Sequence, residues 1–104
     1  MGDWIEACAA DDIDVEDVIP VEIAGRQYAI YRSAESTFHA TDGFCTHERF
    51  ALAAGYVMGS TIECAKHNGT FNYKTGQALE APACINLKTY RTKVEGGRVL
   101  IELG

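Results

Sequence analysis

Two short motifs constrain this chain more than any other feature: Cys45-Thr46-His47 and Cys64-Ala65-Lys66-His67, separated by residues 48–63. Each motif places one thiolate and one imidazole within a single tight loop, and together they offer four ligands of mixed sulfur and nitrogen. Such donors suit zinc, copper or an iron–sulfur centre, whereas calcium and magnesium take oxygen ligands. The sequence therefore predicts a metal centre held by Cys45, His47, Cys64 and His67.

The order of these ligands favours one kind of centre. A zinc finger usually carries both cysteines in one pair and both histidines in the other. Here each loop carries one of each, which fits a two-iron cluster with one iron bound by two thiolates and the other by two imidazoles. The motifs therefore favour a [2Fe–2S] electron carrier. A structural zinc site, which would make the chain an interaction module, is the alternative.

At these motifs the chain resembles the Rieske proteins, and especially the small Rieske-type ferredoxins that serve bacterial ring-hydroxylating oxygenases. The resemblance rests on Cys45-x-His47 and Cys64-x-x-His67. Further residues extend it over the middle of the chain: Leu52, Gly55, Gly59, Ile62-Glu63, Gly69, Phe71, Thr75-Gly76 and Ala81-Pro82. The spaced ligand motifs are the specific part of this likeness.

The resemblance implies a cofactor and a function. It implies one [2Fe–2S] cluster bound by Cys45, His47, Cys64 and His67. It also implies one-electron transfer from an NAD(P)H-dependent flavoprotein reductase to a terminal oxygenase of aromatic hydrocarbon catabolism. No catalytic residue is expected, because the chain has no motif for a mononuclear iron and no nucleotide-binding loop. A monomer is expected, since a shuttle presents one tip to two partners in turn. A Rieske-like small subunit of a larger reductase, such as assimilatory nitrite reductase, is the alternative.

Four positions near the ligands predict a low reduction potential. Respiratory Rieske proteins carry an additional disulfide and two hydroxyl side chains beside the cluster, and hydrogen bonds to sulfur stabilise the reduced state. The matching positions here are Phe50 and Lys66 for the disulfide, and Gly69 and Phe71 for the hydroxyls. We therefore expect a potential in the lower part of the family range of roughly −150 to +300 mV.

The resemblance also implies an exposed tip that carries His47 and His67. Phe50, Leu52 and Pro82 are expected to form an apolar rim for a docking partner, with a core position as the equal alternative for Phe50. Two cations flank the ligands, Arg49 and Lys66. They either steer an acidic partner or are simply solvated, and solvation is the usual role.

Other residues have simpler expected roles. His39, Cys8 and Cys84 lack ligand partners at metal spacing, so structural positions are expected for them. Glycines near the ligand loops are expected at turns and at close backbone approaches; they are Gly43, Gly55, Gly59 and Gly69.

The bulk composition limits the classes of partner. The chain has 104 residues and a net charge of −6, with many of its carboxylates between Asp3 and Asp17. Nucleic-acid binding is not expected from so acidic a chain. The acidic segment is either a docking face for a basic partner or a solvated surface, and a solvated surface is the commoner role. No stretch of about 18 apolar residues predicts a membrane span, and the start does not resemble a signal peptide. A cytoplasmic protein is expected, where cysteines serve as ligands.

The hydrophobic pattern predicts an all-β chain of short strands, forming a small antiparallel sandwich or partly closed barrel with an inserted cluster-binding lobe. One domain is expected over residues 1–104, with cluster-binding loops at about 43–55 and 64–72. The expected strands span 18–23, 27–32, 37–41, 61–63, 70–73, 87–94 and 98–103. Hairpins are expected at Ala24-Gly25-Arg26 and at Glu95-Gly96-Gly97.

Overall fold

The computed structural model describes residues 3–46, 50–65, 69–81 and 85–103. Eleven strands and two short 3-10 helices make up the regular structure of these residues. The strands are β1 (Asp3–Ala9), β2 (Asp17–Ile23), β3 (Arg26–Arg32), β4 (Phe38–Asp42), β5 (Tyr56–Met58), β6 (Thr61–Glu63), β7 (Thr70–Asn72), β8 (Ala78–Glu80), β9 (Thr89–Tyr90), β10 (Thr92–Glu95) and β11 (Arg98–Leu103). The 3-10 helices are η1 (Ala10–Asp12) and η2 (Leu52–Ala54).

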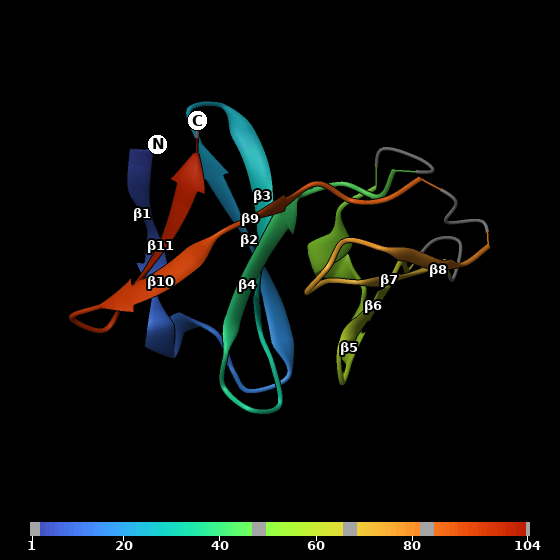
Figure 1. The fold of residues 1–104 in the computed structure, drawn as a ribbon, viewed down its shortest axis with the longest axis horizontal. Helices are drawn as coiled ribbons and strands as arrows, with labels where there is room; N and C mark the ends of the chain where they lie inside the picture. The colour runs from blue at the N-terminus through green and yellow to red at the C-terminus, as the bar shows by residue number, and fades with distance from the viewer. Residues whose placement is uncertain (1–2, 47–49, 66–68, 82–84, 104) are drawn as a thin grey trace.

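The strands form three antiparallel sheets. Two of them, β1-β11-β10 and β2-β3-β4-β9, make a body, and the third, β5-β6-β7-β8, makes a lobe at one end of the long axis (Figure 1). The sheets do not close into a barrel. The all-β prediction is confirmed, and so is the lobe inserted between β4 and β9.

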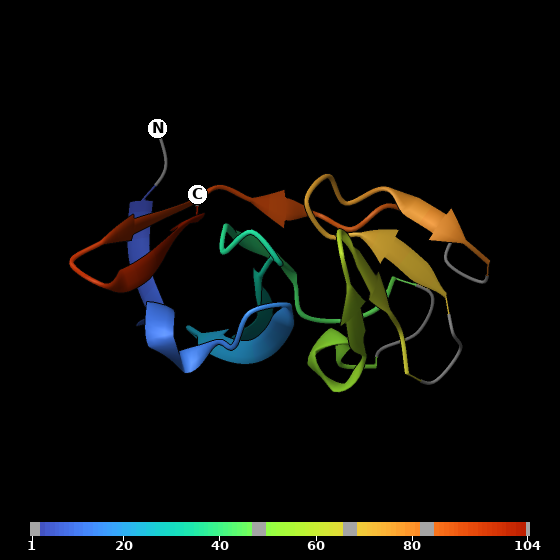
Figure 2. The same ribbon diagram turned by 90° about the horizontal axis from the view of Figure 1, so that it is seen from below.

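Side-chain alternation along β3 explains how the sheet β2-β3-β4-β9 packs against the other body sheet on one face and against the lobe on the other. Successive residues of a strand point to opposite faces of its sheet. Tyr28 and Ile30 belong to the core between the two body sheets, whereas Ala29 and Tyr31 belong to the core beneath the lobe. Both faces of β3 are therefore buried, and the lobe rests on a sheet that has a second sheet behind it (Figure 2).

Both predicted hairpins are confirmed, each with a two-residue turn. Ala24 and Gly25 have φ angles of 52° and 80°, and Gly96 and Gly97 have φ angles of 57° and 76°. Two successive left-handed residues define a type I′ turn, whose twist matches that of the flanking strands. The first turn consists of Ala24 and Gly25 alone. Arg26, which the sequence placed in the turn, is instead the first residue of β3.

Elsewhere the strand prediction differs from the structure in two ways. The single strand expected over residues 87–94 is two strands separated at Arg91, because β9 pairs with β4 while β10 pairs with β11. Strands β1, β5 and β8 were not expected. The structure places β1 along β11 in spite of its acidic residues, and β5 and β8 are only three residues long.

The lobe is joined to the body by contacts of Tyr73 and Gly59. Tyr73 stacks its ring on that of Tyr31, with centroids 4.5 Å apart and planes 7° from parallel. Its hydroxyl donates a hydrogen bond to the carbonyl oxygen of Gly59 at 2.6 Å. The amide of Gly59 in turn donates to the Glu16 carboxylate, which belongs to the body, at 2.9 Å. These contacts hold the lobe in one orientation on the body.

Among the helices that the described ranges contain, none is long and apolar enough to cross a membrane.

Candidate metal centre

Two loops of equal length carry the ligand motifs, and the same kind of hydrogen bond closes each one. The amide of Cys45 donates to the carbonyl oxygen of Phe50 at 2.9 Å, and the amide of Cys64 donates to that of Gly69 at 2.8 Å. In each case the cysteine pairs with the residue five positions later. Since His47 and His67 fall between these ends in the sequence, each closed loop contains one cysteine and one histidine of the predicted set.

Paired backbone segments anchor both loops. Below the first loop, Phe44 bridges to Ala51, and the amide of Leu52 donates to the carbonyl oxygen of Gly43 at 2.9 Å. Below the second loop, β6 pairs with β7 in the register Ile62↔Phe71. Cys45 and Cys64 at the bases of the loops therefore have little freedom to move, which suits a centre that must change charge with little rearrangement.

The structure brings the two cysteines into one core. Cys45 and Cys64 are both buried in the same apolar cluster, which also contains Leu52, Ile62 and Phe71. The histidines of the predicted set, His47 and His67, lie outside the described residues. Two buried thiols at the bases of two matched loops are a donor set that fits a sulfur-ligated iron centre and not an oxygen-liganded cation.

Gly55 is required by the close approach of backbone beside the second cysteine. A Cβ atom at this position would lie 2.0 Å from the carbonyl oxygen of Glu63, the residue before Cys64. Only glycine therefore lets η2 pack against the end of β6. A Cβ at Gly43 would similarly lie 2.6 Å from the carbonyl oxygen of Gln27. The expected close approaches are confirmed at these two glycines, and Gly59 lies in the β5–β6 turn with a φ angle of 58°.

A third segment, residues 85–87, contacts both the first ligand loop and the turn between β7 and β8. The Thr46 hydroxyl donates to the carbonyl oxygen of Ile85 at 2.6 Å, and the amide of Leu87 donates to that of Gly76 at 2.7 Å. The Ile85 side chain is exposed. Thr46 and Ile85 are not among the site residues predicted from the sequence. The position of Thr46 between Cys45 and His47 could have indicated that it lies at the site.

The hydroxyl groups near the cysteines are committed to acceptors other than sulfur. Thr46 donates to the carbonyl oxygen of Ile85, Thr70 donates to the Glu80 carboxylate at 3.0 Å, and Tyr73 donates to the carbonyl oxygen of Gly59. These three are the only hydroxyl side chains among residues 45–46, 50, 64–65 and 69–73. Each has one proton to donate, so none of these three is available to a sulfur atom.

The expected apolar rim is corrected at one residue. Leu52 is fully buried in the core beneath the loops, because η2 turns its side chain inward, so it cannot contact a partner. Phe50 is partly buried and packs against the same core, which favours its alternative role there. Pro82 lies outside the described residues, as do Arg49 and Lys66.

Two of the remaining candidates occupy structural positions. His39 lies on β4, where its Nε2 atom is 2.8 Å from the Thr37 hydroxyl and its ring meets the Tyr73 ring edge to face. Burial and the nearby Lys74 lower the pKa of His39. Cys8 is buried in the body core, where burial raises the pKa of its thiol. Cys84 lies outside the described residues.

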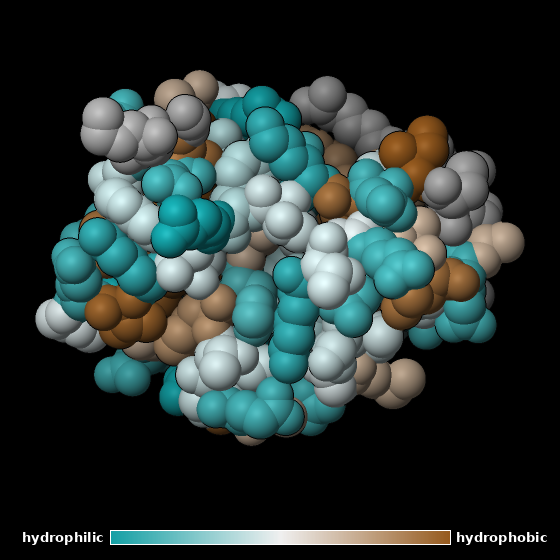
Figure 3. All heavy atoms as spheres, in the orientation of Figure 1, coloured by the Kyte–Doolittle hydropathy of each residue, from teal (hydrophilic) through white to brown (hydrophobic). Residues whose placement is uncertain are grey.

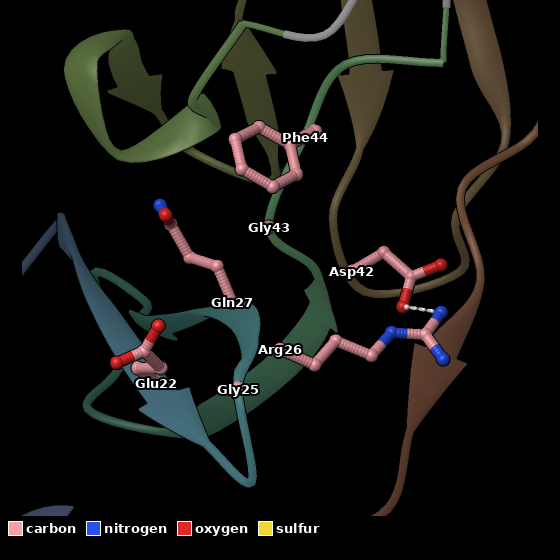
Figure 4. Close-up of a pocket in the computed structure, with 7 residues that line it drawn as sticks. All are labelled: Glu22, Gly25, Arg26, Gln27, Asp42, Gly43 and Phe44. Atoms are coloured by element: carbon pink, nitrogen blue, oxygen red, sulfur yellow. Dashed lines mark hydrogen bonds and ion pairs between the residues drawn. The ribbon is translucent and has the colours of Figure 1, made fainter.

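A surface pocket of about 430 Å³ lies on the body where the chain enters the first ligand loop (Figure 4). Its wall holds an ion pair between Arg26 and Asp42 at 3.1 Å, and the Tyr90 hydroxyl donates to the same carboxylate. Burial and the Asp42 carboxylate raise the pKa of Tyr90. These contacts hold Asp42, the residue before Gly43, in place. They therefore anchor the start of the first ligand loop.

Comparison with known proteins agrees with this geometry. The family model of the Rieske [2Fe-2S] domain matches residues 3–91. The ferredoxin component of a naphthalene 1,2-dioxygenase system from Pseudomonas putida is 45% identical over 96% of this chain and 95% of its own length. The biphenyl dioxygenase ferredoxin subunit of Pseudomonas sp. (strain KKS102) is 33% identical over 95% of this chain and 91% of its own length.

Solved structures show the same likeness. The Sphingomonas yanoikuyae B1 ferredoxin superposes with a TM-score of 0.91 at 30% identity, covering 98% of this chain and all of its own. A chain in the complex of reduced oxygenase and oxidized ferredoxin of carbazole 1,9a-dioxygenase superposes with a TM-score of 0.88 at 32% identity, covering 95% of this chain and 92% of its own. With its closed cysteine loops and the match over residues 3–91, the chain belongs to the Rieske [2Fe–2S] domain family.

Proposed function

We propose that this protein is the ferredoxin of a ring-hydroxylating oxygenase system. It would carry single electrons from an NAD(P)H-dependent flavoprotein reductase to a terminal oxygenase. The observation that carries the proposal is the pair of matched loops, each closed from its cysteine to the residue five positions later. The relatives support it, because several that align over nearly their whole length are ferredoxin components of dioxygenase systems.

The proposed ligands of the cluster are Cys45 and Cys64 for one iron and His47 and His67 for the other. When bound, a [2Fe–2S] cluster accepts and releases one electron at a time. The protein's own part is to supply two buried thiolates from rigid loop bases and two imidazoles from the loops. We further propose one functional domain over residues 1–104, with ligand loops at about 43–55 and 64–72.

The proposed partners follow from the names of the relatives and from the site. One structural neighbour is the ferredoxin of a complex with its oxygenase, which supports an oxygenase as the acceptor. The reductase is the donor that a carrier without a nucleotide-binding motif requires. We propose a monomer in the cytoplasm, where thiols used as ligands stay reduced. The protein itself is proposed to have no catalytic residue.

We propose a reduction potential in the lower part of the Rieske range. The additional cysteines of the respiratory proteins are replaced by Phe50 and Lys66, and their hydroxyl residues by Gly69 and Phe71. The committed hydroxyls of Thr46, Thr70 and Tyr73 strengthen this argument, because they leave the sulfur atoms without these donors. A low potential suits a carrier that passes electrons to an oxygenase.

A reconstitution tests the function. Purified holoprotein is combined with a flavoprotein reductase, NADH and the naphthalene dioxygenase oxygenase component, and product is measured with and without this protein. We expect product only when all three proteins are present. Product formation by this protein and NADH without an oxygenase would contradict the proposal, and so would the absence of cluster reduction by any reductase that reduces a related ferredoxin.

A further inference from the structure

An exposed apolar strip runs along one side of the lobe. Tyr56 and Met58 lie on the same face of β5 and are 62% and 65% exposed, while Val57 between them packs against the core. Strand β5 is the edge of its sheet and pairs only with β6. Its outward side chains are therefore available to another molecule, and large apolar residues in such a position often mark an interaction site.

A third apolar residue extends this strip from the body. The Glu16 carboxylate accepts a hydrogen bond from the amide of Gly59, the residue after Met58. This contact places the loop between η1 and β2 against the β5–β6 turn, at the lower end of the lobe in Figure 1. Val15, which precedes Glu16, is 50% exposed. Val15, Tyr56 and Met58 are called the β5 strip below.

The strip starts beside the metal centre. Tyr56 pairs with Glu63 across the β5–β6 ladder, and Glu63 is the neighbour of Cys64. Met58 lies two residues further along β5, which is about 7 Å at the usual rise of a strand. A protein seated on the strip would therefore reach the base of the second ligand loop.

The charges around the strip decide what kind of protein fits it. Asp14, Glu16 and Asp17 are exposed beside Val15, and Glu63 stands opposite Tyr56. Residues 11–17 and strands β5 and β6 contain no lysine or arginine. Several described cations elsewhere have carboxylate partners, such as Lys74 with Glu35 and Arg98 with Glu6. Arg32 donates to the carbonyl oxygen of Ile13 beside this segment, but the four carboxylates leave the described surface around the strip negatively charged.

We propose that the β5 strip docks a redox protein that presents lysine or arginine side chains around an apolar patch. Apolar contact would supply affinity, and the carboxylates would steer the approach and fix the orientation. The inference rests on the proposed function, since the docked partner exchanges an electron with the centre beside Cys64.

The test uses cytochrome c as the probe, because it is a basic protein whose exposed haem edge is surrounded by lysines. Dithionite-reduced holoprotein is mixed with ferricytochrome c in a stopped-flow instrument, and one electron passes from each reduced protein to one ferric haem. The second-order rate constant is measured between about 0.01 and 0.3 M NaCl, a range over which screening grows strongly.

Two variants test the apolar contact and the electrostatic steering separately. Val15→Ser/Met58→Ser is expected to lower the rate constant about fivefold at every salt concentration, since apolar contact is lost. Asp14→Asn is expected to lower it about twofold at low salt and to have no effect at high salt, since only steering is lost. Val94→Ser and Glu22→Gln are the matched controls, because both residues are exposed on the body, and they should behave as wild type.

Two results separate this inference from the proposed function. If each variant shows the Rieske EPR signal and wild-type melting temperature but also the wild-type rate constant, the strip is not a docking surface and the carrier function stands. If the wild-type protein shows no Rieske signal after dithionite, the proposed function fails first. Equal losses in the strip variants and in the controls would also contradict the inference.

Discussion

At the scale of single residues, two buried thiols in one chain have opposite expected roles. Cys64 follows β6 at the base of the second loop, whereas Cys8 is buried in the body core. Burial alone therefore does not distinguish a ligand from a small core residue. The distinguishing feature is the closed loop that follows Cys64, with its amide bonded to the carbonyl oxygen of Gly69.

Substitution of these cysteines tests that distinction. Cys64→Ser is expected to abolish cluster binding, because a hydroxyl is a poor substitute for a thiolate on iron. Cys8→Ser is expected to retain about two irons and two sulfides per chain and to lose only stability. Iron and acid-labile sulfide assays with visible spectra decide between them. Full cluster content in Cys64→Ser protein would contradict the assignment of the ligand.

Phe71 offers a second test, through the reduction potential. Its ring is buried in the same apolar cluster as Cys45 and Cys64, and no hydroxyl stands at this position. Phe71→Tyr restores the hydroxyl that respiratory Rieske proteins have at the matching position, and one hydrogen bond to a charged group of about 1.5 kcal/mol corresponds to about 60 mV for one electron. We expect the potential to rise by that order in a redox titration.

Phe38→Tyr is the control for this variant, because Phe38 lies on β4 in the body. It should leave the potential at the wild-type value. A potential in Phe71→Tyr protein equal to that of wild type would show that the missing hydroxyl does not set the potential.

At the scale of elements, the approach of η2 to the end of β6 is the most demanding packing contact around the site. Gly55→Ala would place a Cβ 2.0 Å from the carbonyl oxygen of Glu63, so the backbone before Cys64 must shift. We expect reduced cluster loading and a lower melting temperature. Gly96→Ala is the control, because a Cβ there meets nothing within 4 Å and the left-handed turn costs only about 1 kcal/mol.

Cluster loading measured by iron content and thermal melts compares the two variants. The packing argument requires the two alanines to differ, with Gly96→Ala protein fully loaded. Wild-type loading in Gly55→Ala protein would show that the lobe tolerates displacement of β6.

The elements also show how far sequence reasoning reaches. The β2–β3 and β10–β11 hairpins were predictable, because their turns contain glycine between clear strands. The division of the strand expected at 87–94 was not predictable, because Arg91 marks a change of pairing partner and not a local preference. Leu52 was expected at the rim but is buried, because only the packing of η2 shows which way its side chain points. The two Cys-His motifs were predictable, because metal ligands are recognised from residue type and sequence spacing.

At the scale of the whole molecule, a body of two sheets carries the lobe on the outer face of its second sheet (Figure 2). Figure 3 shows the surface of the molecule in the orientation of Figure 1. The Tyr31–Tyr73 stack and the Glu16–Gly59 hydrogen bond join the two parts. The lobe holds Cys45 and Cys64, the two described residues of the proposed ligand set, and the body supports it. Such an arrangement suits a carrier that changes its charge but not its shape.

The most direct test of the account is an EPR-monitored redox titration of the anaerobically purified protein, with iron and sulfide determined on the same sample. We predict about two irons and two sulfides per chain, no signal when oxidised, and a Rieske-type signal when reduced. The midpoint should lie in the lower part of the range of roughly −150 to +300 mV. A colourless protein that contains zinc would contradict the electron-carrier function, and a midpoint near the top of the range would contradict the account of its potential.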